Sequence, residues 1–306
     1  MTDFCQVGLV GVGKVGEGIV KKILSRGHTT YVYDIDNARM KTCIAKGAIK
    51  SKSLEHLARQ CDIVLLSLPS PQSVWDVVLG TEGLLEADCQ GMLIVDLSTN
   101  APHLVRDLGA HCDARGVGFL DAPLTGGMVA AEQGTFTVMI GGKQEDVVRA
   151  QPVLQLFSSR MVHVGPQGHG AATKLLHNML GEIQVYAFAE AFCFAAKLGL
   201  NLNAVYDVLS HGMATSRILT ELYARGALRR NFEPVATVDL AYKDQTLLLE
   251  MASSFSLQLT FSPIVYQHIK ELQRRGLGNK DVTSAILLFE EAFDVVVNVT
   301  DEQLNQ

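Results

Sequence analysis

The sequence contains few cysteines and histidines, and neither type is clustered. Its six cysteines are scattered without a CxxC pair, and its nine histidines include no HExxH motif. Disulfide scaffolds and zinc sites depend on such spacings, so the sequence supports neither. We expect reduced, mostly buried thiols, as in a cytosolic protein, and no metal site.

Blocks of basic residues and long charge-free apolar runs are also absent. The net charge is −6 and no Lys/Arg cluster occurs, which argues against nucleic acid and anionic membranes as partners. Residues 171–198 are apolar, but four charged residues interrupt them, unlike a membrane span: Lys174, Glu182, Glu190 and Lys197. The N-terminus has no positive region ahead of a cleavable apolar stretch, so we expect a cytoplasmic protein without a signal peptide.

The first half of the sequence alternates apolar strands with helical segments. With 306 residues, 48% of them hydrophobic, the chain can form two domains. Near-continuous apolar runs indicate parallel strands buried on both faces, at residues 5–10, 30–33, 62–68, 92–97 and 118–122, with further strands at 135–140 and 161–164. We predict an α/β fold with a Rossmann-type, doubly wound sheet as the dinucleotide-binding domain, residues 1–164.

The second half has helical spacing throughout. A proline-free stretch predicts one helix over residues 171–198, about 40 Å long at 1.5 Å per residue. Further helices are predicted at residues 202–211, 216–225, 238–252, 262–275 and 284–299. We therefore predict an all-α C-terminal domain, residues 165–306, that begins with the long interdomain helix and serves substrate binding and dimerisation.

A glycine-rich turn, Gly11-Val12-Gly13-Lys14-Val15-Gly16, lies between the first strand and a helical pattern. In such a turn the first glycine allows the tight bend. The second lets a pyrophosphate approach the backbone, and the third lets the helix pack on the strand. The phosphates then lie at a helix N-terminus, which favours anions. This context predicts dinucleotide binding.

Asp34 ends the second strand, 34 − 16 = 18 residues after the last glycine of the turn. A carboxylate there can accept hydrogen bonds from a ribose 2′-hydroxyl and would repel a 2′-phosphate, which favours NAD over NADP. The alternative role of Asp34 is a helix N-cap, which Asp36 and Asn37 could equally supply.

Polar and glycine residues follow the carboxyl ends of the predicted strands, where ligands of parallel sheets gather. They include Thr125-Gly126-Gly127, whose hydroxyl and exposed N–H groups suit a carboxylate, although a plain turn explains it equally well. On the long helix, Lys174, His177 and Asn178 share one face. Alone they could be a solvated first turn, and Lys243-Asp244 an exposed charged pair on an amphipathic helix.

Four motifs together resemble the β-hydroxyacid dehydrogenase family, of which 3-hydroxyisobutyrate dehydrogenase is the best-known member. They stand in the family's order over almost the whole chain: G-V-G-K-V-G at 11–16, D-A-P-L-T-G-G at 121–127, G-H-G-A-A-T-K-L-L-H-N at 168–178 and D-L-A-Y-K-D at 239–244. The resemblance implies an NAD(P)-dependent oxidoreductase of short 3-hydroxy acids, with its active site between the two domains.

The family's roles carry over to matching positions of this sequence. Lys174 looks like the catalytic general acid and base, and Asn178 looks like its partner in holding the substrate. Thr125, Gly126 and Gly127 look like the carboxylate-binding loop. Positions that resemble cofactor contacts, beside the glycine turn and Asp34, are Leu68, Pro69, Ser73, Thr99 and Lys243.

Some positions depart from the family. Methionine is usual at Val15 and asparagine is frequent at Lys22, serine is usual at Thr125, and many relatives have asparagine at His177. The last two changes lie where the substrate is expected, so the particular acid stays open.

The expected reaction interconverts a short hydroxy acid and its semialdehyde or keto form. The cofactor carries the hydride, and Lys174 accepts or returns the hydroxyl proton. Alternatives are a non-catalytic binding protein on the same fold and a reductase of another carbonyl or imine. A small carboxylate is the expected partner. The long apolar helix also favours a homodimer or homotetramer.

Overall fold

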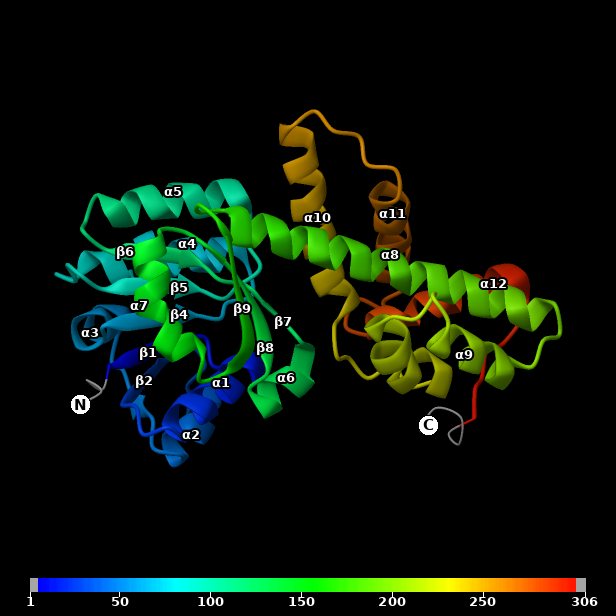
Figure 1. Ribbon diagram of the computed structural model, residues 1–306, viewed down its shortest axis with the longest axis horizontal. Helices are drawn as coiled ribbons and strands as arrows, with labels where there is room; N and C mark the ends of the chain where they lie inside the picture. Colours follow the sequence, from blue (N-terminus) through cyan, green and yellow to red (C-terminus); the bar gives the residue numbers. More distant parts are fainter. Residues whose placement is uncertain (1–4, 301–306) are drawn as a thin grey trace. The chain divides into compact units, whose positions relative to one another are not determined.

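The computed structural model describes residues 5–300 of the chain (Figure 1). The chain divides into two compact units, Met1–Lys174 and Leu175–Gln306. The border therefore falls inside the long helix, ten residues beyond the expected border at residue 164. The two units are described separately below.

Unit 1 is built on one nine-stranded sheet with the order β3-β2-β1-β4-β5-β6-β8-β7 and with β9 beside β8. The strands from β3 to β6 are parallel, β8 is antiparallel to β6 and β7, and β9 is parallel to β8. The strands are β1 (Val7–Val10), β2 (Thr30–Tyr33), β3 (Ile49–Lys50), β4 (Ile63–Leu66), β5 (Leu93–Asp96), β6 (Gly118–Asp121), β7 (Leu124–Thr125), β8 (Phe136–Gly141) and β9 (Ser158–Gly165). The seven predicted strands are present. The two-residue strands β3 and β7 are too short to give a periodic signal.

Successive residues of the central strands point to opposite faces of this sheet, and each face has its own core. Leu9 and Leu65 belong to one apolar cluster, whereas their neighbours Val10 and Val64 belong to the other. The first cluster is covered by α1 (Lys14–Leu24), α2 (Asn37–Ala45), α6 (Gly127–Gln133) and α7 (Gln144–Leu154), and the second by α3 (Leu54–Gln60), α4 (Pro71–Leu79), α5 (Pro102–Asp113) and the short η1 (Leu84–Glu86). Helices on both faces of a mostly parallel sheet confirm the predicted doubly wound fold.

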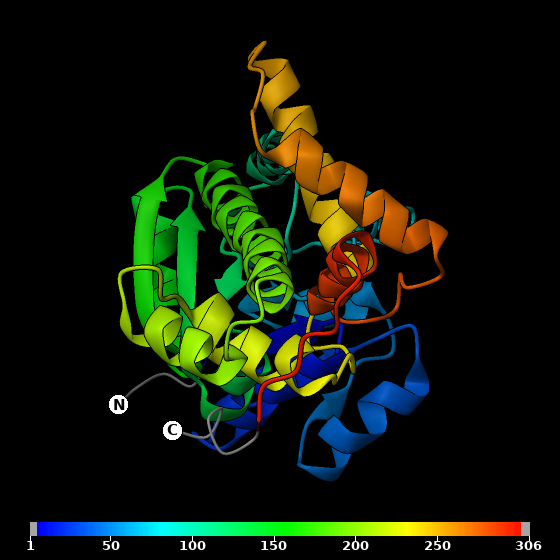
Figure 2. The same ribbon diagram turned by 90° about the vertical axis from the view of Figure 1, so that its right-hand side faces the viewer.

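Unit 2 is helical, as predicted. It contains most of α8 (His169–Lys197), then α9 (Leu202–His211), η2 (Ile218–Tyr223), η3 (Ala227–Arg229), α10 (Val238–Ser254), α11 (Ser262–Arg274), η4 (Val282–Ala285) and α12 (Ile286–Phe293). α10 and α11 run side by side (Figures 1 and 2). Buried aromatic side chains form the centre, with Phe188 and Phe192 of α8 against Tyr223. Within residues 5–300, α8 is also the one helix long and apolar enough to cross a membrane by length and composition.

Two predicted helices of unit 2 differ from expectation, one in its helix type and the other in its start and end. The segment expected at 216–225 is a π-helix over Ile218–Tyr223. The segment expected at 284–299 starts with a 3₁₀ turn and ends at Phe293, because Asp294 is left-handed with φ 52°. Beyond it the buried carboxylate of Glu290 accepts a hydrogen bond from Val297 N at 2.7 Å, which fixes the chain in a non-helical path.

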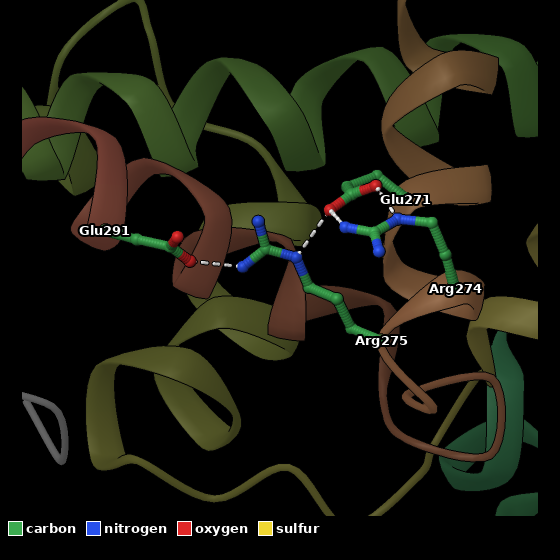
Figure 3. A network of polar contacts seen from close by, with 4 residues as sticks. All are labelled: Glu271, Arg274, Arg275 and Glu291. Carbon is green, nitrogen blue, oxygen red and sulfur yellow. Dashed lines mark hydrogen bonds and ion pairs between the residues drawn. The ribbon is translucent and has the colours of Figure 1, made fainter.

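A charged network joins the end of α11 to α12 on the surface of unit 2 (Figure 3). Glu271 accepts hydrogen bonds from Arg274 Nε and Arg275 Nε, both at 2.7 Å, and Arg275 also pairs with Glu291. The two guanidinium groups lower the pKa of Glu271 to about 2. Exposed ion pairs contribute little to stability, so this network orients helix ends more than it holds the core.

Candidate active site

In the glycine-rich turn after β1, each of the three glycines has a different steric environment at its Cβ position. A Cβ on Gly11 would lie 2.3 Å from Ser67 O, and Gly11 has φ 89°. A Cβ on Gly16 would lie 2.1 Å from Gly11 O, so the helix start packs directly on the turn. Around Gly13, the residue before α1, a Cβ would meet nothing within 4 Å. The turn therefore leaves open space at the helix N-terminus where a pyrophosphate fits, with Val12, Lys14 and Val15 alongside.

Asp34 follows β2 and is tied to this turn. It is 8% exposed, and its carboxylate accepts hydrogen bonds from Val12 N at 2.9 Å and Asp36 N at 2.8 Å. The N-cap of α2 is Asp36, which accepts from Ala38 N at 2.8 Å, so Asp34 is not needed as a helix cap. Asp34 thus lies beside the glycine turn, and the neighbouring Ile35 is 93% exposed.

The remaining candidate cofactor contacts of unit 1 lie after β4, which neighbours β1 in the sheet, and after β5, which neighbours β4. Leu68 N donates to Ser98 Oγ at 3.0 Å, which links the two strand ends. Pro69 follows, and Ser73 lies in the first turn of α4, where Ser70 caps its N–H at 3.1 Å. Thr99 is half-buried between β5 and α5. These residues and the glycine turn share one edge of the sheet, the edge where such folds bind ligands.

The loop predicted to bind a carboxylate has an unusual backbone. Thr125 pairs with Thr137 in the β7–β8 ladder, and the next two residues have positive φ, 131° at Gly126 and 62° at Gly127. A Cβ on Gly126 would lie 2.4 Å from Ala130 Cβ, whereas one on Gly127 would meet nothing within 4 Å. The first glycine is required by packing, and the second has a left-handed backbone with open space at its Cβ position.

Helix α8 carries Lys174 and Asn178 one turn apart, and the amide of Asn178 is fixed from two sides. Its Nδ2 donates to Asp244 Oδ2 at 2.6 Å, and its Oδ1 lies 3.0 Å from His177 Nδ1. Lys174 and Asn178 are half-buried, whereas His177 is exposed. The ammonium of Lys243 lies 3.2 Å from Asp244 Oδ1. One carboxylate therefore holds two of the predicted site residues, Asn178 and Lys243.

Two family profiles together match nearly the whole chain. Residues 6–165 match the NAD binding domain of 6-phosphogluconate dehydrogenase, and residues 168–289 match the NAD-binding region of NADP-dependent 3-hydroxyisobutyrate dehydrogenase. The chain belongs to the β-hydroxyacid dehydrogenase family. The expected resemblance is confirmed.

Several characterised members of this dehydrogenase family align along most of their length. The chain is 28% identical to 2-(hydroxymethyl)glutarate dehydrogenase of Eubacterium barkeri, covering 97% of this chain and 99% of the relative. It is also 28% identical to the mitochondrial 3-hydroxyisobutyrate dehydrogenase of Drosophila melanogaster, covering 94% and 91%. A crystal structure of 3-hydroxyisobutyrate dehydrogenase from Salmonella typhimurium superposes with a TM-score of 0.84 at 26% identity, covering 93% and 99%. These similarities support NAD(P)-dependent hydroxyacid dehydrogenase activity, with NAD as cofactor and NADP possible.

Asp244 of this dehydrogenase contacts two predicted site residues, and the sequence interpretation gave it no role. The alternative interpretation of Lys243-Asp244 as an exposed charged pair does not hold for Asp244, which is 5% exposed. On α10, Asp244 stands in the same buried row as Ala241, Leu248 and Ala252. A carboxylate at an apolar position of a helical repeat was the available signal, because a buried charge needs partners.

Asp121 is the second missed residue of the dehydrogenase. It ends β6 with 1% exposure and accepts hydrogen bonds from Gly168 N at 3.0 Å and Ala171 N at 2.7 Å. Burial raises the pKa of Asp121 to about 6 despite these hydrogen bonds. Asp121 begins one of the quoted motifs, yet it was assigned no role. Its position at the end of an apolar strand was the signal.

Among residues 5–300, the other titratable groups of the dehydrogenase form no second cluster of this kind. All six cysteines are free and five are buried, so the thiols are mostly buried as expected. Burial is the main cause that raises the pKa of Cys5 to about 11, which makes it a poor nucleophile. Within residues 5–300 no group of three or more His, Cys, Asp or Glu side chains could hold a metal ion. A cavity of about 610 Å³ lies at the α10–α11 turn near Ala252, Leu257 and Pro263, and none of the predicted site residues lines it.

Proposed function

We propose that the protein interconverts a short 3-hydroxy acid of the 3-hydroxyisobutyrate type and its semialdehyde or keto form, with NAD as preferred cofactor and Lys174 as general acid and base. The observation that carries the proposal is the arrangement around α8. Lys174 stands one turn before Asn178, whose amide is held by a buried carboxylate that also pairs with Lys243. A binding protein without chemistry would not need this arrangement.

The residues divide the work of the reaction. The glycine turn and Asp34 would hold NAD, which when bound would supply the hydride acceptor for oxidation or, as NADH, the hydride donor for reduction. In oxidation the hydroxyl proton passes to the neutral amine of Lys174, and in reduction the ammonium gives that proton to the new alkoxide oxygen. The N–H groups of Gly126 and Gly127 and the hydroxyl of Thr125 bind the substrate carboxylate. Asn178 orients the substrate oxygen toward Lys174.

The buried carboxylate fixes which way the Asn178 amide points. Because Asp244 accepts from Nδ2, the oxygen Oδ1 faces His177, and the amide cannot flip without losing a charge-assisted hydrogen bond. One N–H of Nδ2 is used by Asp244, and the other can serve the substrate oxygen. The same orientation serves both directions of the reaction.

The decisive experiment follows nicotinamide absorbance with a panel of hydroxy acids and semialdehydes, first in the wild type and then in Lys174→Ala. Removal of a positioned acid or base lowers kcat by roughly 10²- to 10⁴-fold. Lys174→Arg should be nearly as slow, because a guanidinium does not release its proton near neutral pH. Lys197→Ala, in the exposed last turn of the same helix, is the matched control and should keep wild-type kcat.

Two results would overturn the proposal. Near-normal turnover of Lys174→Ala with the best substrate would remove Lys174 from the chemistry. Reduction of imines or unrelated carbonyls at rates above those of every hydroxy acid and semialdehyde would point to another reductase on this fold. NAD(H) affinity should be similar in wild type and Lys174→Ala, since the glycine turn and Asp34 are unchanged.

A further inference from the structure

A buried carboxylate closes the N-terminal end of α8. The two oxygens of Asp121 accept one hydrogen bond each, Oδ1 from Gly168 N and Oδ2 from Ala171 N. Gly168 is the residue before α8 and Ala171 lies in its first turn, and N–H groups at these positions have no partner within the helix itself. The start of α8 is therefore bound to the end of strand β6 by two hydrogen bonds to a single side chain.

Close packing leaves this helix start no room to shift. A Cβ on Gly170 would lie 2.5 Å from Met139 O and 2.6 Å from Asp121 O. A Cβ on Gly141 would lie 2.5 Å from Asp121 Oδ1. Glycine at both positions lets the helix approach β6 and β8 closely enough for the carboxylate to reach its two N–H groups. The carboxylate is thus the polar centre of a tightly packed joint.

Unit 1 contains two parts of the proposed site, the substrate loop and Lys174, and each is close in sequence to one side of this joint. Asp121 precedes the carboxylate-binding loop Thr125-Gly126-Gly127 by four residues, and its partner Ala171 precedes Lys174 by three. Resting on the function proposed above, we propose that Asp121 is a positioning residue, whose carboxylate fixes the first turn of α8 and so sets the place of Lys174 relative to the substrate loop. A misplacement of about 1 Å can cost 10²-fold in rate, so such a joint controls kcat.

The electrostatics of the joint favour a functional explanation. Burial is the main cause that raises the pKa of Asp121 to about 6, and the charge of Asp96 on the neighbouring strand also raises it. At neutral pH the carboxylate is still ionised, although burial disfavours its charge. Among the described residues, the titratable or charged side chains printed in contact with the segment that leads into the joint are His163 of β9 at Gly165 O, His169 of α8 near Gly165 and Arg106 of α5 near Gly168. A neutral side chain would be less costly to bury, but it would not accept two N–H groups with full charge.

The test is Asp121→Asn, assayed in the direction of reduction with NADH. In this direction Lys174 must be protonated, so it contributes no loss of rate on acidification. Wild-type kcat should fall as the pH drops below about 6, and the variant should have a kcat roughly 10- to 100-fold lower with no such acid limb. Since His163 and His169 remain in the variant, loss of the limb assigns it to Asp121. KM should change less than kcat.

A second measurement tests the contact between Asp121 and the start of α8 independently of catalysis. Amide hydrogen exchange at Gly168 and Ala171 should be faster in Asp121→Asn than in wild type at the same pH. Asp146→Asn is the matched control, because Asp146 is also buried and packs against Gly118 at the opposite end of the same strand. It should leave the acid limb and the exchange at both amides unchanged.

The outcomes separate this inference from the proposed function. If Lys174→Ala is inactive but Asp121→Asn keeps wild-type kcat and its acid limb, the positioning role is wrong and the function stands. If Lys174→Ala is active, the proposed function fails first, and unchanged exchange at Gly168 and Ala171 would then remove the joint as well. Should Asp121→Asn fail to fold, a wild-type profile without an acid limb near pH 6 overturns the inference by itself.

Discussion

At the scale of single residues, Asp244 connects two motifs that are far apart in sequence. Asn178 of one motif and Lys243 of the other contact its carboxylate. Asp244→Asn keeps the shape and removes the charge. We expect kcat to fall and KM to rise together, by about tenfold in kcat/KM, because a hydrogen bond to a charged group is worth roughly 1.5–3 kcal/mol. Steady-state kinetics of this variant beside Glu250→Gln, an exposed carboxylate of the same helix, would check this. Equal kinetics in the two variants would contradict it.

Asp34 carries the prediction on cofactor choice. Its oxygens each accept one backbone N–H and keep further lone pairs for a ribose hydroxyl. The wild type should therefore have a higher kcat/KM with NAD(H) than with NADP(H). In Asp34→Asn, kcat/KM with NAD(H) divided by kcat/KM with NADP(H) should be about tenfold smaller than in wild type, since the repulsion of a 2′-phosphate disappears. A wild-type preference for NADP(H) would reverse this assignment.

The candidate site could be predicted from sequence only where residue type and local spacing carry the information. The glycine turn, Asp34 and the Lys174–Asn178 pair are local patterns on one turn, strand end or helix face. Asp244 and Asp121 act through partners 66 and 50 residues away, so their importance depends on tertiary contacts. Local periodicity could indicate that each would be buried, but it could not name the group that each would hold.

At the scale of elements, the joint between β6 and α8 predicts how stability changes with pH. The pKa of Asp121 is about 6 in the folded protein, above its ordinary value of about 3.9, so folding favours the protonated form. Its ionisation therefore removes stability as the pH rises through about 4 to 6, by up to about 3 kcal/mol at neutral pH.

Thermal unfolding of wild type and Asp121→Asn at several pH values measures this effect. The Tm of the variant relative to wild type should be higher at pH 7 than at pH 4.5, because the asparagine carries no buried charge at either pH. The contribution of every other group cancels in this difference. A relative Tm that falls toward neutral pH would mean that the ionised carboxylate stabilises the fold.

Elements were predictable to different degrees. The buried parallel strands gave the strongest signal, because both faces of β4 and β5 are apolar and their runs are uninterrupted. The π-helix at Ile218–Tyr223 and the early end of α12 at Phe293 gave none. The chain after α12 is held by the hydrogen bond from Val297 N to Glu290, a contact that no helical pattern encodes.

At the scale of the whole molecule, the apolar surface of α8 bears on assembly. Three large side chains of this helix, and Leu198 directly after it, are about half exposed or more: Leu176, Leu180 and Phe194 of the helix. Contiguous exposed apolar surface favours association, so we expect a homodimer or homotetramer. Light scattering should give a mass of at least twice 33.2 kDa over a range of concentrations. A monomer mass at every concentration would contradict this, and Leu180→Glu should shift the distribution toward monomer.

The border between the two compact units runs through an uninterrupted helix, between Lys174 and Leu175, where many two-domain proteins have a flexible linker. The number of residues between two side chains of a helix sets both their distance along its axis and the angle between them around it. One residue inserted after Leu175 would turn every later side chain by about 100° about the axis and move it about 1.5 Å along it. Asn178 would leave the face of Lys174, although no residue of either motif had changed. Substitutions in this part of α8 can be gradual in effect, but insertions and deletions cannot, so chimaeras with related dehydrogenases must join here without gain or loss of a residue.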